Sequence, residues 1–142
     1  MAHTYNDGIL PIGFWADTAL SSYKYYVAAA ASTVDYVKLA GGASNPMPMG
    51  IIQDDNAASI GQEVAVKVFG YSKAVVDARD VVGNACPVVP GTLLTCGSES
   101  KLMVAGASGI CCARSWGAIS TGSAIINVFF FGGVTGSTAA AS

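Results

Sequence analysis

The chain has 142 residues, of which 52% are hydrophobic and 11% are charged, and its formal net charge is −2. Because a soluble domain carries about 25% charged residues, this shortage of charge predicts that other protein covers part of the surface. The seven Lys and Arg residues are scattered, which argues against nucleic acid as a partner. The longest strongly apolar run, Ile125–Phe131, is far shorter than the roughly 20 residues that cross a bilayer, so no membrane partner is expected.

Residues 1–20 are predicted to form an extended N-terminal arm, because Asp7-Gly8 and Pro11 through Gly13 interrupt regular structure. The segment has no basic region followed by an apolar one, so no secretory signal is expected and synthesis is assigned to the cytoplasm. The large apolar side chains of this arm dock either on a partner or on the protein's own core. The candidates for partner contact in the arm are Tyr5, Ile9, Leu10, Phe14 and Trp15.

A β domain is expected over residues 21–133. The segment Ser21–Ala31 is ambiguous, since its alanines favour helix whereas its Tyr-Lys-Tyr-Tyr-Val run favours strand. We interpret it as a strand, because Thr33–Leu39 alternates in polarity and suits the second strand of a hairpin. Gly41–Pro48 is predicted to be a loop, since its prolines prevent regular pairing.

Three further strands are predicted in the middle of the chain, separated by polar or Gly-containing turns. The period-two alternation of the second strand places Val64, Val66 and Val68 toward the core. The same alternation places Lys67 outward, in water. The three predicted strands are Ile51–Gln53, Val64–Phe69 and Lys73–Ala78.

The C-terminal half is predicted to hold a loop, a hairpin, two more strands and a tail. Gly83 and two prolines place the loop at Asp80–Pro90. The hairpin turns at Gly97-Ser98, and residues 134–142 are expected to form a flexible tail because their composition is of low complexity. The predicted strands are Gly91–Cys96, Lys101–Ala105, Ile110–Ala113 and Ile125–Phe131.

The block Gly50–Ala78 has a looser copy at Gly109–Phe131. Both copies open with Gly-Ile and run through polar or small residues to a second glycine, Gly61 or Gly122. An apolar strand begins three residues after that glycine in each copy. This pattern is typical of a β scaffold and hints at two similar β lobes, although no linker divides the chain.

Residues that could carry chemistry are few. The sole histidine, His3, lies in the arm, and the four cysteines lack C-x-x-C spacing. A zinc site, a Cys-His pair and a Ser-His-Asp centre are therefore not expected, and neither enzymatic activity nor a cofactor is predicted. We interpret Cys86, Cys96, Cys111 and Cys112 as small buried hydrophobes, with a disulfide between the first two as the less favoured alternative.

Three other motifs are candidates for a binding site. The glycines of Gly117–Ser123 are spaced like those of a phosphate-binding loop, but the required Lys is missing. Asp54-Asp55 with Asp77 and Asp80 could bind a cation, although solvated turn carboxylates are the favoured interpretation. Arg114 and Trp116 suggest a binding site, with Trp116 a further candidate for partner contact, and an exposed loop or a subunit contact explains them equally well.

A series of short motifs runs from Tyr23 to Phe131. Its positions are Gly-Ile-Ile-Gln at 50–53, then Gly61, Gln62, Val64 and Val66, then Gly70, Lys73 and Ala78, and finally Gly109, Ile110, Gly122 and Val128. In order and spacing this series resembles the head-decoration, or capsid cement, proteins of tailed bacteriophages. The segment Asp80–Cys96 and the aromatic arm depart from that pattern.

The resemblance implies an all-β subunit, a small β-barrel or β-tulip-like domain that is often a homotrimer. It also implies a virion protein on the outer capsid surface that bridges major capsid proteins and is made in the host cytoplasm. A coat or tail-tube subunit is the alternative within the structural class. A small β-barrel carbohydrate-binding or enzymatic domain is the alternative from another class.

Overall fold

The structure is a computed structural model that describes residues 7–41, 48–106 and 110–135. The predicted all-β class is confirmed, since the described residues form strands, and none of them forms a helix that is long and apolar enough to cross a membrane. The strands are β1 (Ile12–Ala16), β2 (Val27–Ala30), β3 (Tyr36–Leu39), β4 (Pro48–Ile52), β5 (Glu63–Lys67), β6 (Gly70–Asp80), β7 (Leu93–Cys96), β8 (Leu102–Val104), β9 (Ile110–Ser115) and β10 (Ser123–Thr135).

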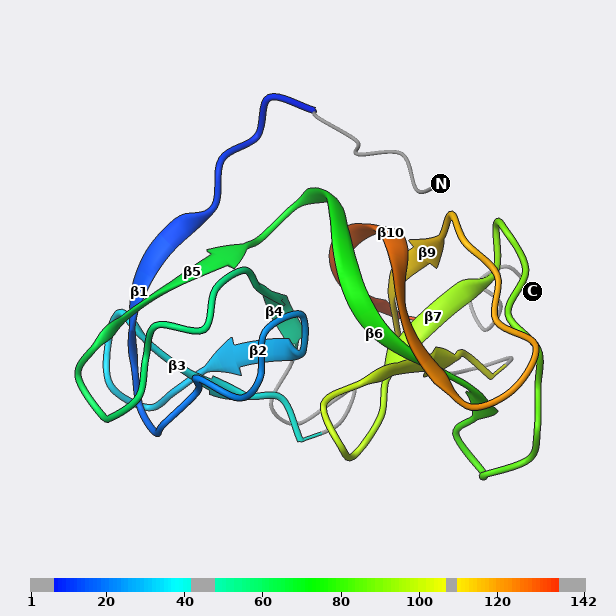
Figure 1. Ribbon diagram of the computed structural model, residues 1–142, viewed down its shortest axis with the longest axis horizontal. Coiled ribbons are helices and arrows are strands. Elements are labelled where there is room, and N and C mark those ends of the chain that lie inside the picture. Colours follow the sequence, from blue (N-terminus) through cyan, green and yellow to red (C-terminus); the bar gives the residue numbers. More distant parts are fainter. Residues whose placement is uncertain (1–6, 42–47, 107–109, 136–142) are drawn as a thin grey trace.

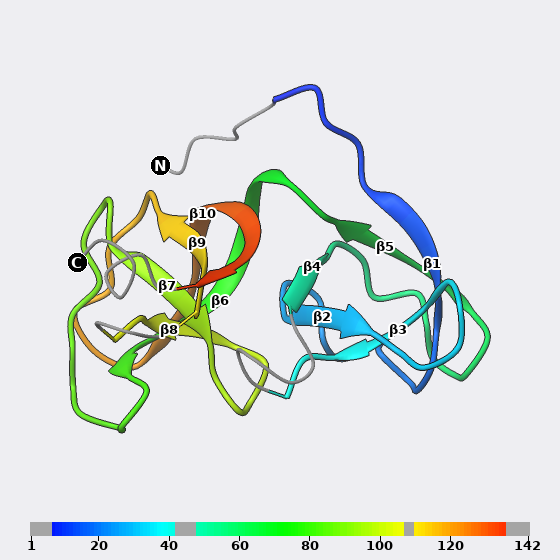
Figure 2. The ribbon, with the colours of Figure 1, turned by 180° about the vertical axis from the view of Figure 1, so that it is seen from behind.

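The strands close into two five-stranded barrels that lie side by side (Figure 1). The first barrel has the strand order β1-β3-β2-β4-β5, and the second has the order β10-β6-β8-β7-β9. The view from behind shows the same two lobes, joined by the short connection from β5 to β6 (Figure 2). The expectation of two β lobes is therefore confirmed, and each lobe is a closed barrel.

Strand β1 corrects the predicted extent of the N-terminal arm. It pairs antiparallel with β5 and parallel with β3, so residues 12–16 belong to the first barrel. Ala16 and Leu20 are fully buried in its core. Gly13 does not interrupt the strand, because its missing side chain leaves room for the carboxylate of Glu63 from β5. The arm boundary at residue 20 was therefore wrong, and of the described residues only 7–11 precede the strands of the barrel.

The predicted hairpin of the first barrel is confirmed for its second half only. Strands β2 and β3 pair antiparallel, but residues 21–26 form turns instead of strand. Tyr25 explains the change, since its backbone φ of 72° lies outside the range of a strand, and its N–H and carbonyl bind two other segments. Its N–H donates to the Ile52 carbonyl at 2.7 Å, and its carbonyl accepts from the Val75 N–H at 3.0 Å, which ties the two barrels together.

Two long antiparallel strands, β6 and β10, form the wall of the second barrel. The predicted hairpin of β7 and β8 is confirmed. A hydrogen bond within the predicted loop after β6 stabilises it, since the Asp80 carboxylate accepts from the Asn84 N–H at 3.0 Å. Strand β10 continues to Thr135, so a tail that begins at residue 134 is wrong for its first two residues. Residues 136–142 of the predicted tail lie outside the described residues.

The two sequence copies adopt the same local geometry. Gly61 and Gly122 have positive φ values of 84° and 72°, a conformation that glycine adopts without steric cost. Each glycine precedes the second strand of an antiparallel pair, β4 with β5 or β9 with β10. The repeat is thus a strand–turn–strand motif, used once in each barrel.

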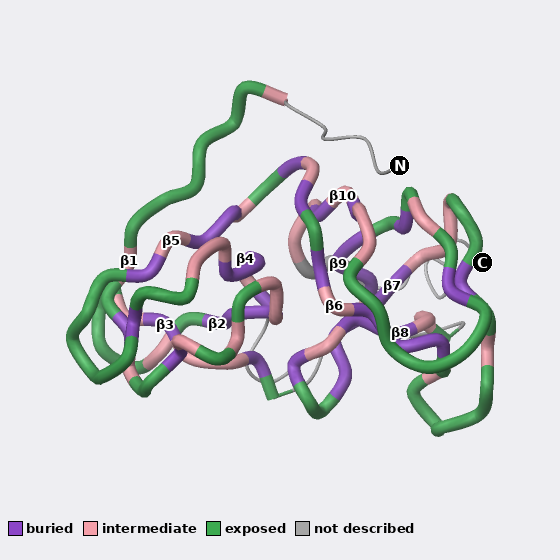
Figure 3. Tube along the Cα trace, in the orientation of Figure 1, coloured by how far each residue is buried: buried purple, intermediate pink, exposed green. Residues whose placement is uncertain are grey.

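Buried residues lie along strands of both barrels (Figure 3), but the two cores are organised differently. One buried cluster lies wholly within the first barrel and includes Leu20, Val64 and Val66. The other fills the second barrel around Phe130 and extends to Val27 and three more residues of the first barrel. The contact between the barrels is therefore part of a continuous core, which makes the molecule one folded unit.

Candidate functional site

Lys67 on β5 is not in water, contrary to the alternation-based prediction. It is only 7% exposed, and its ammonium group lies 2.9 Å from Asp7 Oδ1 and donates to the Ile9 carbonyl at 2.7 Å. The N-terminal segment covers this end of β5, and a strand's own alternation contains no information about such a cover. The lysine is thus a bonding partner for the segment ahead of β1.

Asp7 is the centre of a set of hydrogen bonds and an ion pair that we call the latch. The latch consists of Asp7, Ile9, Lys67 and Tyr71. Asp7 Oδ2 accepts from the Tyr71 N–H at 2.7 Å, while Oδ1 also accepts from the Ile9 N–H at 2.9 Å. Gly70 lies beneath the carboxylate with a φ of 108°, and a side chain there would collide with Asp7. The latch therefore holds the N-terminal segment across the junction of β5 and β6.

The hydrogen bond from Lys67 is the main reason that the pKa of Asp7 lies well below its ordinary value. The backbone N–H groups of Ile9 and Tyr71 lower this pKa further, and partial burial of the carboxylate offsets part of the effect. Asp7 is therefore charged at neutral pH, and its charge is matched by that of Lys67.

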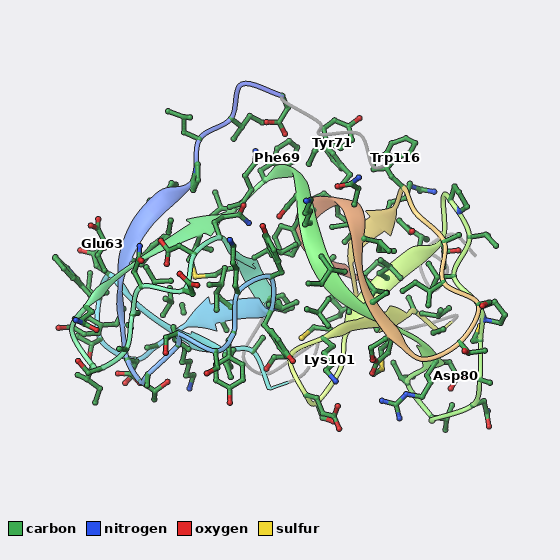
Figure 4. All side chains as sticks on the ribbon, in the orientation of Figure 1. Glu63, Phe69, Tyr71, Asp80, Lys101 and Trp116 are labelled. Atoms are coloured by element: carbon green, nitrogen blue, oxygen red, sulfur yellow. The ribbon has the colours of Figure 1, made fainter. Side chains whose placement is uncertain are left out.

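An aromatic patch lies beside the latch and consists of Phe69, Tyr71, Trp116 and Phe129. Figure 4 shows Phe69, Tyr71 and Trp116 along the same side of the molecule. The Tyr71 ring lies 5.0 Å from that of Phe129 and 5.9 Å from that of Trp116, and Phe69 meets Phe129 at 5.2 Å. Phe69 and Trp116 are 46% and 42% exposed, so much of this aromatic surface faces water.

The residues predicted to contact a partner lie in different parts of the molecule. Ile9 and Leu10 lie on the segment beside the aromatic patch, and Leu10 is 79% exposed. Phe14 is half-buried and packs against the core cluster of the first barrel. Trp15 is exposed but lies on the first barrel, whereas Trp116 is on the second. Tyr5 lies outside the described residues.

Trp15 faces a separate depression of about 520 Å³ on the first barrel. Asp54 helps to shape this depression, because its Oδ2 accepts from the Ala65 N–H at 3.1 Å. The depression combines an exposed indole with carboxylate and amide groups. It is lined by Gly13, Trp15, Asp54, Asn56, Gly61, Gln62, Glu63 and Ala65.

The four aspartates weighed as a cation site are not brought together. Asp54 and Asp55 belong to the first barrel, whereas Asp77 and Asp80 belong to β6. Asp77 is buried, lies 2.7 Å from Arg79 Nη2 and accepts a hydrogen bond from the Ser123 hydroxyl. Within the described part of the chain, no group of three or more His, Cys, Asp or Glu residues could hold a metal ion.

The cysteines are packing residues of the second barrel. None of the four forms a disulfide, so Cys86 and Cys96 are not joined. Cys96, Cys111 and Cys112 are buried, which confirms their interpretation as small hydrophobes, whereas Cys86 is half-buried. Burial raises the pKa of the Cys112 thiol far above its ordinary range, so this thiol is a poor nucleophile.

The residues that sequence reasoning missed are Lys67, Phe69, Tyr71 and Phe129. A Phe-Gly-Tyr run at 69–71 was the available signal, since a glycine between two aromatics at a turn leaves both rings near the surface. A comparison of the chain with protein-family models finds no match, and a comparison with curated proteins finds none either. The residues of the chain itself therefore carry the functional argument.

Proposed function

We propose that this protein is a structural decoration, or cement, subunit that binds the outer surface of an icosahedral viral head and bridges its major capsid proteins. The aromatic patch beside the latch is the observation that carries the proposal. Two of its rings, Phe69 and Trp116, are 46% and 42% exposed, and Leu10 on the N-terminal segment is 79% exposed. An apolar surface of this kind, on a chain with only 11% charged residues, suits a partner protein.

The mechanism is association without turnover. Burial of apolar surface contributes about 25 cal/mol per Å² before the costs of association are subtracted. Large aromatic side chains commonly dominate such contacts, which favours Phe69 and Trp116 as anchors. Repetition over many sites on one head turns a modest energy per subunit into resistance to internal pressure. In this proposal the subunit forms a homotrimer on the virion surface and needs no cofactor.

The test is binding to heads that lack this chain. We expect Trp116→Ala and Phe69→Ala to reduce the bound copies per head at least about tenfold, because each removes an aromatic anchor. Val82→Ala is the matched control, since Val82 is 80% exposed in the loop after β6. Thermal melts of all three variants should stay close to that of the wild type.

Two results would count against this proposal in different ways. If wild-type protein fails to bind heads at all, the decoration function is wrong. If both aromatic variants bind heads as well as the control, the function stands but another surface makes the contact. Spontaneous assembly of the isolated protein into shells or stacked rings would favour the coat or tail-tube alternative.

The Trp15 depression favours a second candidate function, a carbohydrate-binding module. An indole face packs against the C–H groups of a sugar ring, and the carboxylate and amide groups of Glu63 and Asn56 can bind its hydroxyls. In this case, maltotriose, lactose or chitotriose should raise the melting temperature of the wild type but not of Trp15→Ala. Absence of any such shift over millimolar concentrations of all three sugars would reject this candidate.

A further inference from the structure

We propose that the latch is exchanged between copies of this chain, so that Asp7 of one subunit binds Lys67 and the Tyr71 N–H of its neighbour. The inference rests on the proposed function of an assembling subunit and names the contact that ties subunits together. A second copy of the chain is thus the partner, and the seat of the latch on β5 and β6 is the surface that receives it.

The seat is complete without the strand that carries the latch. Lys67 Nζ and the Tyr71 N–H, both of which bind Asp7, come from β5 and β6, and neither comes from β1. Gly70 provides the space for the incoming carboxylate. An Asp7 from another copy meets the same donors, the same space and the same positive charge. The contact within one chain therefore shows what an exchanged contact would look like.

The connector between the latch and β1 is short and uncovered. Ile9 belongs to the latch and β1 begins at Ile12, so only Leu10 and Pro11 lie between them. We call the form in which the latch lies within one chain the closed form. In this form Leu10 and Ile12 are 79% and 48% exposed, so both side chains are in contact with water. Short connectors of this kind favour exchange of a terminal segment between identical subunits.

The length of the segment restricts where the neighbour sits. Five extended residues, 7–11, span at most about 18 Å at 3.3–3.6 Å per residue. The seat of the neighbour must therefore lie within that distance of the start of β1. Such a neighbour approaches the junction of the barrels and covers Leu10 and Phe69, the apolar surface that the closed form leaves exposed.

The balance between closed and exchanged forms depends on concentration. Both forms make the same ion pair and hydrogen bonds, so these contacts favour neither form. The tether raises the effective concentration for closure to the millimolar range, whereas exchange gains the burial of Leu10 and Ile12. We therefore expect closed monomers in dilute solution and exchanged latches in an assembly.

A charge-swap experiment removes the closed form and isolates exchange. Asp7→Lys and Lys67→Asp each place like charges at the latch of their own chain. In an equimolar mixture, the native Asp7 of the second variant can bind the native Lys67 of the first, and the reversed pair forms in the other direction. Native mass spectrometry should show hetero-oligomers in the mixture that neither variant forms alone, and their absence from a mixture of folded variants would refute exchange.

The double variant Asp7→Lys/Lys67→Asp is the control, because it restores opposite charges within one chain and should form no more oligomers than the wild type. It does not restore the hydrogen bonds that Asp7 accepts from the Ile9 and Tyr71 N–H groups or the one that Lys67 donates to the Ile9 carbonyl, so its stability should be lower. Lys67 is buried, so Lys67→Asp could fail to fold. In that case, zero-length carbodiimide coupling of ¹⁴N and ¹⁵N wild-type protein, mixed at millimolar concentration, tests the same point. Coupled Asp7–Lys67 peptides of mixed isotope support exchange, and same-isotope peptides alone overturn it.

Different results would refute the exchange of the latch and the decoration function. Normal binding to heads without mixed-isotope peptides would refute the exchange and leave the decoration function intact. Mixed-isotope peptides from a protein that binds no heads would refute the decoration function and keep the exchange.

Discussion

The two barrels have the same number of strands but depend on each other to different degrees. The inner cluster of the first barrel uses only its own residues, among them Leu20, Val37 and Val64. The cluster of the second barrel extends across the junction to include Val27 and Ile51 from β2 and β4. The first barrel can therefore lose its inner packing locally, whereas damage at the centre of the second cluster removes support from both barrels.

The largest effect is expected at the centre of the second cluster. Phe130→Ala empties the site of a fully buried aromatic ring and should destabilise the protein by about 3–5 kcal/mol. Urea unfolding measures the loss, and hydrogen exchange should show reduced protection in the strands of both barrels. Reduced protection confined to β6–β10 would mean that the barrels are less coupled than their shared core suggests.

Leu20→Ala is the counterpart in the first barrel. Leu20 is fully buried in the self-contained cluster, so its truncation should cost about 2–5 kcal/mol. Here we expect faster hydrogen exchange in β1, β3 and β5, while β6 and β10 keep their protection. An equal loss in all strands would contradict the asymmetry between the two cores.

A smaller effect is expected from breaking the latch, which joins the barrels at their surface. Lys67→Ala removes the hydrogen bonds that the ammonium group donates to Asp7 and Ile9, at a cost of about 1–3 kcal/mol. Lys73→Ala, an exposed lysine on β6, is the control and should change stability by less than about 0.5 kcal/mol. Equal urea midpoints for the two variants would show that the latch contributes nothing to the fold.

The latch should also be sensitive to acid. The pKa of Asp7 is lowered in the folded state from an ordinary value of 3.8, so its stabilisation is fully present above that value. The stabilisation is lost as the pH falls below 3.8 through the lower folded pKa. The Tyr71 amide resonance should follow this titration in the wild type and stay flat in Asp7→Asn. A Tyr71 resonance that titrates in both proteins would assign the transition to another group.

The mildest perturbation is alkylation of the thiols, all of which belong to the second barrel. Cys86 is half-buried and should react with iodoacetamide first, whereas the fully buried Cys112, with its raised pKa, should react only when that barrel opens. Peptide mass spectrometry of the labelled protein orders the two rates. Rapid labelling of Cys112 in the folded protein would mean that the second barrel opens readily.

Features that depend on the local sequence pattern, such as the burial of side chains along one strand, could be predicted from the sequence. The neighbouring residues Val66 and Lys67 show where such prediction stops. Alternation correctly placed Val66 in the core, because one face of a barrel strand always points inward. It wrongly placed Lys67 in water, because the cover comes from Asp7, sixty residues earlier in the chain. The turns at Gly61 and Gly122 were also predictable from the local sequence, because glycine readily adopts the positive φ that each of them has.

The candidate site was predicted less well than the fold. Exposed apolar residues such as Leu10 and Trp116 could be selected by residue type, but the type alone did not separate them from Phe14, which is half-buried against the core of the first barrel. The aromatic patch needed the β6–β10 register, which places Tyr71 opposite Phe129. Pairing between distant strands is a property of the assembled sheet, and no window of the sequence contains it.

Closure of both sheets has a consequence for how this protein behaves when it is crowded. Every described strand has a neighbour on each side, so its backbone offers no open sheet edge to which a foreign strand could add. A chain with so little charge would otherwise be prone to aggregate by edge-to-edge pairing. Molecules packed at high density therefore meet through side chains, turns and the N-terminal segment, and such contacts can form and dissociate without rearranging a sheet.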